Sequence, residues 1–230
     1  MSLDRNTLLQ MGSLALLTAK AAPNTRPTAS LFGLDRSGSM HAFGVSPADA
    51  VRSFIHELKT SPNANITAAG VVTFADGAKL DIPLQMVADI NLDTFRYTPN
   101  GGTRLYATVA DILQSMIDLH QHVLQETKGQ LNLGVVVGFV TDGYNNIEHE
   151  AIRDVRRLAA EGTRRKFIMQ IFGLGIDAKE QARNMGFPED HAYNLHRNAA
   201  SVHAAAAQAS QATRHSTVMN IPVVDPDSQP

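Results

Sequence analysis

The feature that most restricts the fold of this chain is a continuous apolar segment, rich in valine, at residues 133–140. A strand with one face in water alternates apolar and polar residues, whereas a strand buried on both faces does not. The segment therefore predicts a central strand of a sheet that helices cover on both sides. Residues 167–176 predict a second strand of the same kind.

Strand and helix patterns alternate along the rest of the chain. Further strands are predicted at residues 29–35, 66–74, 78–84 and 191–195, with a hairpin turn at Asp76-Gly77. Helices are predicted at residues 48–59, from Thr103 to a stop at Lys128-Gly129, and at residues 150–161, 178–185 and 199–213. This alternation indicates βαβ units, and it predicts an α/β fold with a doubly wound, mostly parallel sheet.

The length of 230 residues suits one α/β domain with a sizeable core. We expect this domain at residues 28–224, after an N-terminal helical extension at residues 1–27 and before a flexible tail at residues 225–230. The formal net charge is -2, so the protein as a whole is not attracted electrostatically to nucleic acid or to an anionic membrane. We therefore expect neither of them as a partner.

The chain has no cysteine, which excludes disulfides, thiolate metal sites and cysteine nucleophiles. This composition suits a reducing compartment, so we expect a cytoplasmic protein. In the alternative interpretation, residues 1–21 are a signal peptide with a cleavage site at Ala19-Lys20-Ala21, and the protein is a secreted adhesin. The apolar stretch near the N-terminus is too short to cross a bilayer.

Oxygen-bearing side chains gather where predicted strands end. Asp35, Ser37 and Ser39 follow the first strand, Asp142 follows the strand at residues 133–140, and Thr103 precedes the long helix. In doubly wound sheets, ligands bind beyond the carboxyl ends of the strands, where the strand order reverses. Two carboxylates and three hydroxyls can supply the oxygen shell that a hard cation such as Mg²⁺ requires.

These three loops resemble the metal-ion-dependent adhesion site of von Willebrand factor A domains, and the resemblance runs from about residue 29 to residue 176. The resemblance implies a bacterial-type, stand-alone A domain with strand order 3-2-1-4-5-6, in which strand 3 is an antiparallel edge. It also implies that the hydroxyl groups bind a divalent cation directly and that the aspartates often act through water. The implied metal-site residues are Asp35, Ser37, Ser39, Thr103 and Asp142.

The implied function is that of a metal-dependent protein-binding module. The cation is expected to be Mg²⁺, with Mn²⁺ and Ca²⁺ as alternatives, and to coordinate an Asp or Glu of a partner protein. By analogy, the partner is an AAA+ ATPase or an assembly encoded in the same operon. We expect the partner to contact a rim of flanking residues, namely Met40, Gly102, Arg104, Gly143 and Tyr144.

The same residues allow two other interpretations. A Mg²⁺-dependent hydrolase or phosphotransferase usually needs a nucleophile or base beside the metal. No second carboxylate lies two residues after Asp35, and no histidine lies in the three loops. We therefore expect that the protein is not an enzyme. In the other interpretation, Asp35 and Asp142 only cap turns or helices.

A basic cluster lies outside these loops, in and after the helix predicted at residues 150–161. Its members are Arg153, Arg156, Arg157, Arg164, Arg165 and Lys166. The simplest interpretation is a solvated helix face, and the alternative is a docking surface for an acidic partner or for nucleic acid.

Overall fold

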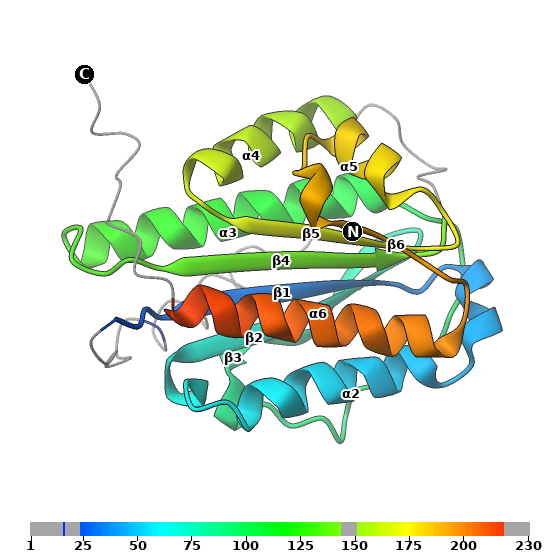
Figure 1. Ribbon diagram of the computed structural model, residues 1–230, viewed down its shortest axis with the longest axis horizontal. Helices are drawn as coiled ribbons and strands as arrows, with labels where there is room; N and C mark the ends of the chain where they lie inside the picture. Colours follow the sequence, from blue (N-terminus) through cyan, green and yellow to red (C-terminus); the bar gives the residue numbers. More distant parts are fainter. Residues whose placement is uncertain (1–15, 17–23, 144–150, 219–230) are drawn as a thin grey trace.

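The computed structural model describes residue 16 and residues 24–143 and 151–218. In this part of the chain, a six-stranded sheet lies between two layers of helices (Figure 1). The strand order is β3-β2-β1-β4-β5-β6, and of these strands only β3 is antiparallel to its neighbour. The strands are β1 (Thr28–Asp35), β2 (Thr67–Phe74), β3 (Ala78–Met86), β4 (Gly134–Thr141), β5 (Ile168–Leu174) and β6 (Ala192–Leu195). The predicted fold class and strand order are confirmed.

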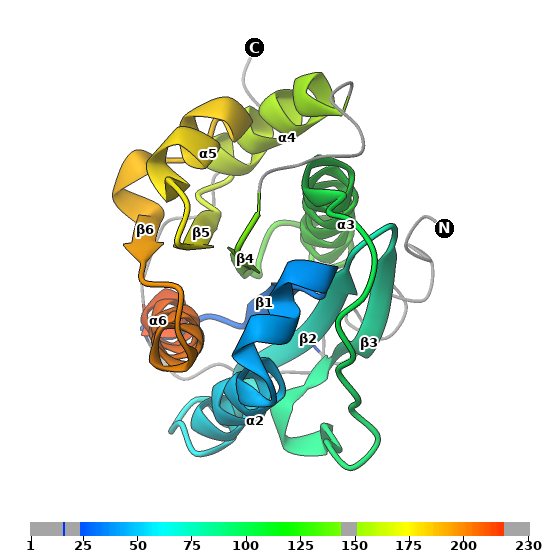
Figure 2. The same cartoon turned by 90° about the vertical axis from the view of Figure 1, so that its right-hand side faces the viewer.

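The helices cover both faces of the sheet (Figure 2). One face carries α2 (Ser46–Lys59) and α6 (Ala199–Val218). The other face carries α3 (Leu105–Glu126), α4 (Ile152–Arg164) and α5 (Ala178–Met185). Short 3-10 helices are η1 (Gly38–Phe43), η2 (Ala64–Ile66), η3 (Val87–Asp89) and η4 (Glu189–His191).

Each helical layer covers its own apolar core. Neighbouring residues of β1 point into different cores: Leu31 packs on the side of α3, and Phe32 packs on the side of α2 and α6. The ring of Phe32 stacks on Phe54 of α2 with the centroids 5.0 Å apart. Every residue of β1, β2 and β4 is buried, which explains why these strands lack the polar alternation of an exposed sheet.

The two central strands approach closely at Gly33. A Cβ atom at this position would lie 2.6 Å from Cδ1 of Phe139 on β4, which is closer than carbon atoms pack. Glycine is therefore required here so that the Phe139 ring can cover β1. This close contact lies between the two paired strands whose carboxyl ends carry the candidate site.

Some element bounds differ from the sequence-based expectations. Helix α6 continues to Val218, five residues beyond the predicted end, because the buried Thr213, Ser216 and Thr217 pack inward. Most of the predicted N-terminal extension and the whole predicted tail lie outside the described residues. Within the extension, Leu16 is fully buried in the core on the α3 side. Among the described residues, no helix is both long and apolar enough to cross a membrane.

The strand order reverses between β1 and β4. From β1 the chain continues to β2 on one side, and from β4 it continues to β5 on the other side. Leu34 pairs with Val140 across the two central strands, so Asp35 and Thr141 follow at neighbouring strand ends. The fold therefore places the loops after β1 and β4 next to each other.

Candidate metal centre

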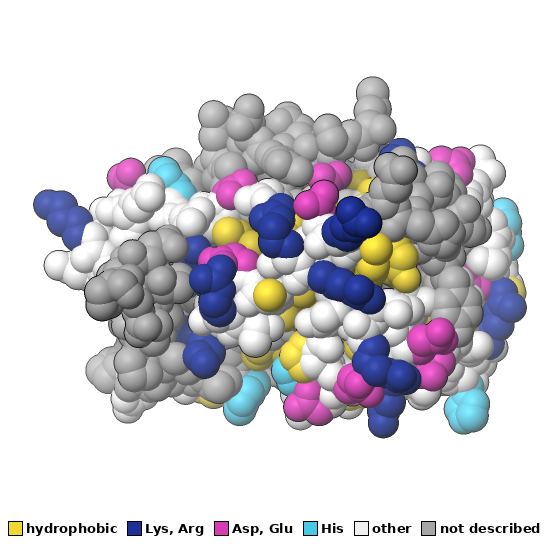
Figure 3. Space-filling model, turned by 90° about the horizontal axis from the view of Figure 1, so that it is seen from above, with side chains coloured by type: hydrophobic (Ala, Val, Ile, Leu, Met, Phe, Trp, Pro, Cys, Tyr) yellow, Lys and Arg dark blue, Asp and Glu magenta, His cyan; other side chains and the backbone are white. Residues whose placement is uncertain are grey.

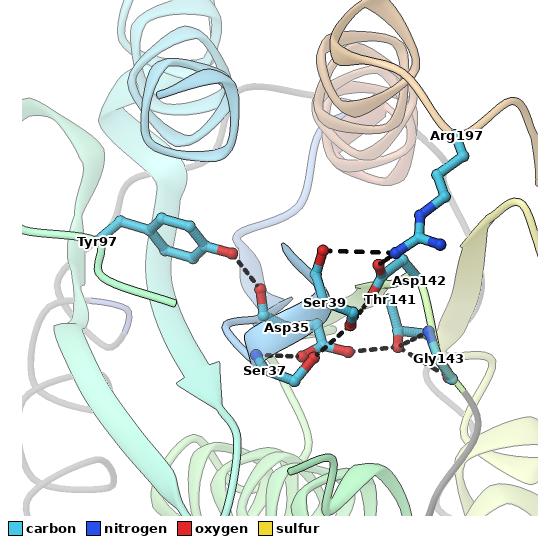
Figure 4. A network of polar contacts seen from close by, with 8 residues as sticks. All are labelled: Asp35, Ser37, Ser39, Tyr97, Thr141, Asp142, Gly143 and Arg197. Carbon is cyan, nitrogen blue, oxygen red and sulfur yellow. Dashed lines mark hydrogen bonds and ion pairs between the residues drawn. The ribbon is translucent and has the colours of Figure 1, made fainter. Parts of the chain in front are cut away.

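The loop after β1 is held in a tight turn by its own first residue. The backbone N–H of Ser37 donates a hydrogen bond of 2.7 Å to Oδ1 of Asp35. The hydroxyl oxygens of Ser37 and Ser39 lie 3.1 Å apart, so both point to the same side of the loop (Figure 4). Of the three side chains, Asp35 and Ser37 are buried, whereas Ser39 is exposed.

The loop after β4 is joined to the first loop through hydroxyl groups. The hydroxyl of Thr141 donates to Oδ2 of Asp35 at 2.6 Å. The hydroxyl of Ser39 donates to Oδ1 of Asp142 at 2.6 Å. Each of the two carboxylates therefore accepts a hydrogen bond from the other loop, and the network brings both carboxylates into one cluster (Figure 4).

The loop before α3 lies against both of the others. The backbone N–H of Gly38 donates to the carbonyl of Gly101 at 2.9 Å, which joins it to the loop after β1. A Cβ atom on Gly143 would lie 3.5 Å from the hydroxyl oxygen of Thr103, which places this hydroxyl beside the loop after β4. All five predicted metal-site residues are thus brought together at one edge of the sheet.

The site is buried and negatively charged on its inner side. Asp35 is 0% exposed and Asp142 is 7% exposed. Burial raises the pKa of Asp35 to about 6, hydrogen bonds from Thr141 and Ser37 oppose the shift, and the charge of Asp142 adds to it. A raised carboxylate pKa means that the ionised form is poorly solvated, so a cation bound here would offset that cost.

Three side chains that the sequence motifs did not identify also hold these loops. The hydroxyl of Tyr97 donates to the backbone carbonyl of Asp35 at 2.6 Å, and burial raises the pKa of this phenol. Asp76, at the predicted hairpin turn, accepts from the backbone N–H of Gly102 at 2.6 Å. Arg197, from the connection between β6 and α6, donates to Oδ2 of Asp142 at 2.7 Å (Figure 4).

The residues of the predicted partner-binding rim do not all lie at the surface. Gly102, Arg104 and Gly143 are partly exposed beside the site. Met40 is a correction, because its side chain is 0% exposed and packs in the core on the side of α2. It is turned inward by η1, which begins directly after Ser37. Tyr144 lies outside the described residues.

The candidate donor set consists of oxygen atoms. Among the described residues, no group of three or more His, Cys, Asp or Glu side chains could hold a metal. The cluster instead combines two carboxylates with neutral hydroxyls, and such oxygen donors suit hard divalent cations such as Mg²⁺, Ca²⁺ and Mn²⁺. The residues present therefore fit a divalent hard cation.

Comparisons with known proteins support the fold. No family model matches the chain, and no curated protein matches it. Among solved structures, it is similar to proximal thread matrix protein 1 from the mussel byssus, with 19% identity, a TM-score of 0.57, and 83% of this chain and 47% of that chain covered. The same protein has been solved with a zinc-occupied MIDAS motif, at the same identity and TM-score.

Two bacterial proteins show the same likeness. The pilus adhesin SpaC from Lactobacillus rhamnosus GG has 12% identity and a TM-score of 0.63, with 86% of this chain and 32% of that chain covered. The PilB minor pilin from Streptococcus sanguinis has 12% identity and a TM-score of 0.55, with 92% of this chain and 65% of that chain covered. This chain thus spans less than two thirds of each of these proteins. The likeness shows that the chain shares the fold of these proteins.

Proposed function

We propose that this protein is a metal-dependent protein-binding module. Its metal centre would hold one divalent cation, Mg²⁺ in the first place, on Ser37, Ser39 and Thr103, with Asp35 and Asp142 supplying the balancing charge. The cation would then coordinate an Asp or Glu carboxylate of a partner protein. The observation that supports this proposal most strongly is the convergence of three separate loops at the reversal of strand order.

The charge and exposure of the site support the binding of an acidic partner. Two carboxylates balance a divalent cation, and three neutral hydroxyls leave it able to attract a further anion. The exposed Ser39 marks the side of the cluster that faces solvent, whereas Asp35 lies on the buried side. A partner carboxylate would therefore approach from the side of Ser39.

The surroundings of the site favour binding over catalysis. The loops at residues 35–39, 100–103 and 141–143 contain no histidine that would act as a general base. The similar structures include one described as a pilus adhesin and one described as a thread matrix protein, which supports an adhesive or assembly role. We propose a protein partner, with an AAA+ ATPase or an operon-encoded assembly as the candidate, and no enzymatic activity.

Nucleic acid is a less suitable partner. Figure 3 shows Lys and Arg side chains interspersed with Asp and Glu side chains on the face that carries α4 and α5. Several of the basic residues there are paired: Arg157 with Asp154 at 3.5 Å, and Arg165 with Glu161 at 2.5 Å. Arg165 is buried, so the basic cluster is not simply a solvated helix face. Mixed charge of this kind weakens attraction to phosphate chains.

The proposal can be tested with a displayed library of peptides that carry a central Asp or Glu. Peptides selected on the full chain in Mg²⁺ should lose binding in EDTA, and again when the acidic residue is changed to Asn or Gln. Binding should also be lost with Asp35→Asn but not with Asp93→Asn, an exposed aspartate away from the loops. Selected peptides that are indifferent to EDTA and to the acidic residue would contradict the proposal.

A further inference from the structure

Arg197 reaches the metal centre from a part of the chain that carries none of its motifs. It lies in the short connection between β6 and α6, residues 196–198. The backbone of this connection is fixed on both sides. The N–H of Gly175 donates to the carbonyl of Leu195 at 2.8 Å, and the side chain of Asn198 accepts from the N–H of Ser201 at 2.9 Å, in the first turn of α6.

The aliphatic stem of Arg197 lies against Gly175 in the loop after β5. A Cβ atom on Gly175 would lie 3.0 Å from Cβ of Arg197, which is tighter than ordinary packing. Gly175 also has a φ of 78°, where a side chain is strained. The glycine therefore lets the Arg197 stem pass close to the loop after β5 and directs the guanidinium toward Asp142.

The guanidinium binds the carboxylate oxygen that the hydroxyl network leaves open. Ser39 donates to Oδ1 of Asp142, and Nη2 of Arg197 donates to Oδ2 at 2.7 Å. The same nitrogen lies 3.4 Å from the backbone carbonyl of Ser39. The Asp142 side chain is 0% exposed, whereas the Arg197 side chain is 51% exposed. One end of this ion pair is thus fixed in the protein, and the other borders on water.

We propose that Arg197 is a built-in competitor of the metal, an arginine latch on Asp142 that sets the affinity of the site for divalent cations. This inference rests on the proposed function, because it requires that Asp142 belongs to a cation site. In the absence of metal, the guanidinium compensates the buried charge of Asp142. When a divalent cation binds, two positive charges meet at one carboxylate and repel each other.

The geometry allows the latch to open at low cost. Half of the Arg197 side chain already lies in water, so the guanidinium can be solvated when it leaves, and the bound cation would then compensate the buried charge of Asp142. Its departure would leave a cationic side chain at the border of the site. The ion pair therefore opposes metal binding without preventing it, and removing the guanidinium should tighten metal binding.

Isothermal titration of Mn²⁺ and of Mg²⁺ into the full chain tests this inference. Arg197→Gln removes the charge, and Arg197→Lys retains it. The control Arg214→Gln removes an arginine of similar exposure from the other end of α6, where it pairs with Glu57 at 3.6 Å. Arg197→Gln should bind the cation about threefold to tenfold more tightly than the unaltered chain, an effect typical of a partly exposed ion pair. Arg197→Lys keeps the charge, so its affinity for the cation should be close to that of the unaltered chain. The affinity of Arg214→Gln should also be close to that of the unaltered chain.

Thermal unfolding gives a second readout that a merely structural role would not produce. Without metal, Arg197→Gln should melt at a lower temperature, because Asp142 loses its partner. The rise in melting temperature on adding Mg²⁺ should be larger than in the unaltered chain. A merely structural arginine would lower the melting temperature equally with and without metal, and that result would overturn the inference.

The outcomes separate this inference from the function on which it rests. If the unaltered chain binds the cation and Arg197→Gln binds it no more tightly, the latch is wrong and the metal centre stands. If only Arg197→Gln binds the cation, the arginine does compete at Asp142, but the unaltered chain does not hold a metal and the proposed function is overturned. If neither protein binds Mn²⁺ or Mg²⁺, both proposals are overturned.

Discussion

Two buried polar clusters lie at opposite ends of the sheet, and they differ in whether the chain completes them. At the amino end, Nε and Nη2 of the buried Arg26 donate to the carbonyl and hydroxyl oxygens of Ser216 at 2.8 and 3.0 Å. Ser216 lies in the last turn of α6, where carbonyl oxygens carry partial negative charge. At this end the chain itself supplies the cation and its acceptors.

The carboxyl end carries two buried carboxylates. Asp35 and Asp142 are buried there together, and Asp142 pairs with the half-exposed Arg197. Burial raises the pKa of Asp35, and the hydrogen bonds from Thr141 and Ser37 oppose this shift only in part. The comparison indicates that the amino-end cluster is structural, whereas the carboxyl-end cluster is suited to an external cation. Helix α6 connects the two, with Arg197 before its first turn and Ser216 in its last (Figure 1).

The largest expected effect concerns the carboxyl end. Asp35→Asn keeps the shape of the side chain and removes the buried charge. We expect the affinity for Mg²⁺ to fall at least about 100-fold, because one of the two balancing charges is lost. Isothermal titration against Asp93→Asn as the control measures the effect. Equal Mg²⁺ affinity in both variants would mean that the carboxyl-end cluster is as self-sufficient as the amino-end one.

The amino end should respond in stability and not in metal binding. Arg26→Met keeps an apolar stem and removes the charge-assisted hydrogen bonds to the end of α6. We expect the free energy of unfolding, measured by urea denaturation, to fall by about 2–3 kcal/mol. The Mg²⁺ affinity of the folded variant should stay unchanged. A loss of metal affinity comparable with that of Asp35→Asn would show that the two ends are not independent.

The free energy of unfolding should depend on pH through the carboxyl-end cluster. Since the folded-state pKa of Asp35 is raised to about 6 from 3.8, the folded protein binds a proton that the unfolded chain does not. In EDTA, the contribution of Asp35 to stability should thus fall by about 1 kcal/mol as the pH rises from 5 to 7. Subtracting the same pH series for Asp35→Asn isolates this contribution. If the difference in unfolding free energy between the unaltered chain and Asp35→Asn does not change between pH 5 and 7, the raised pKa of Asp35 is contradicted.

The smallest expected effect is that of a single neutral donor. Thr103→Ala removes one hydroxyl and no charge, so the affinity for Mg²⁺ should fall about fivefold, less than for Asp35→Asn. Thr60→Ala, at an exposed position after α2, serves as the control in the same titration. A loss as large as that of Asp35→Asn would mean that charge balance does not dominate the site.

The sequence predicted the parts of this site that depend on local pattern and strand order. The apolar segments before Asp35 and before Asp142 identified two central strands, and the ends of neighbouring parallel strands must lie together. The loop with Asp35, Ser37 and Ser39 also carries its own signal, because its spacing forms a tight turn. These features depend on residues that are close in sequence or on the sheet as a whole.

The remaining contacts depend on the paths of loops, which no local pattern predicts. Arg197 is 55 residues beyond Asp142 and lies in a connection without a motif. Tyr97 reaches Asp35 across 62 residues. The sequence predicts Asp76 only as a turn residue, whereas its carboxylate also accepts a hydrogen bond from the backbone N–H of Gly102. The position of Met40 next to the motif predicts a rim residue, but the helical turn of η1 directs its side chain into the core.

The most direct test of the cation site is electron paramagnetic resonance of Mn²⁺ together with the relaxation rate of water protons. We predict one bound Mn²⁺ per chain, displaced by Mg²⁺, with enhanced water relaxation that shows a coordination position open to solvent. Asp35→Asn should abolish the signal of bound Mn²⁺, whereas Asp93→Asn should retain it. Absence of bound Mn²⁺ at millimolar concentration, or equal binding by both variants, would contradict a cation held between the three loops.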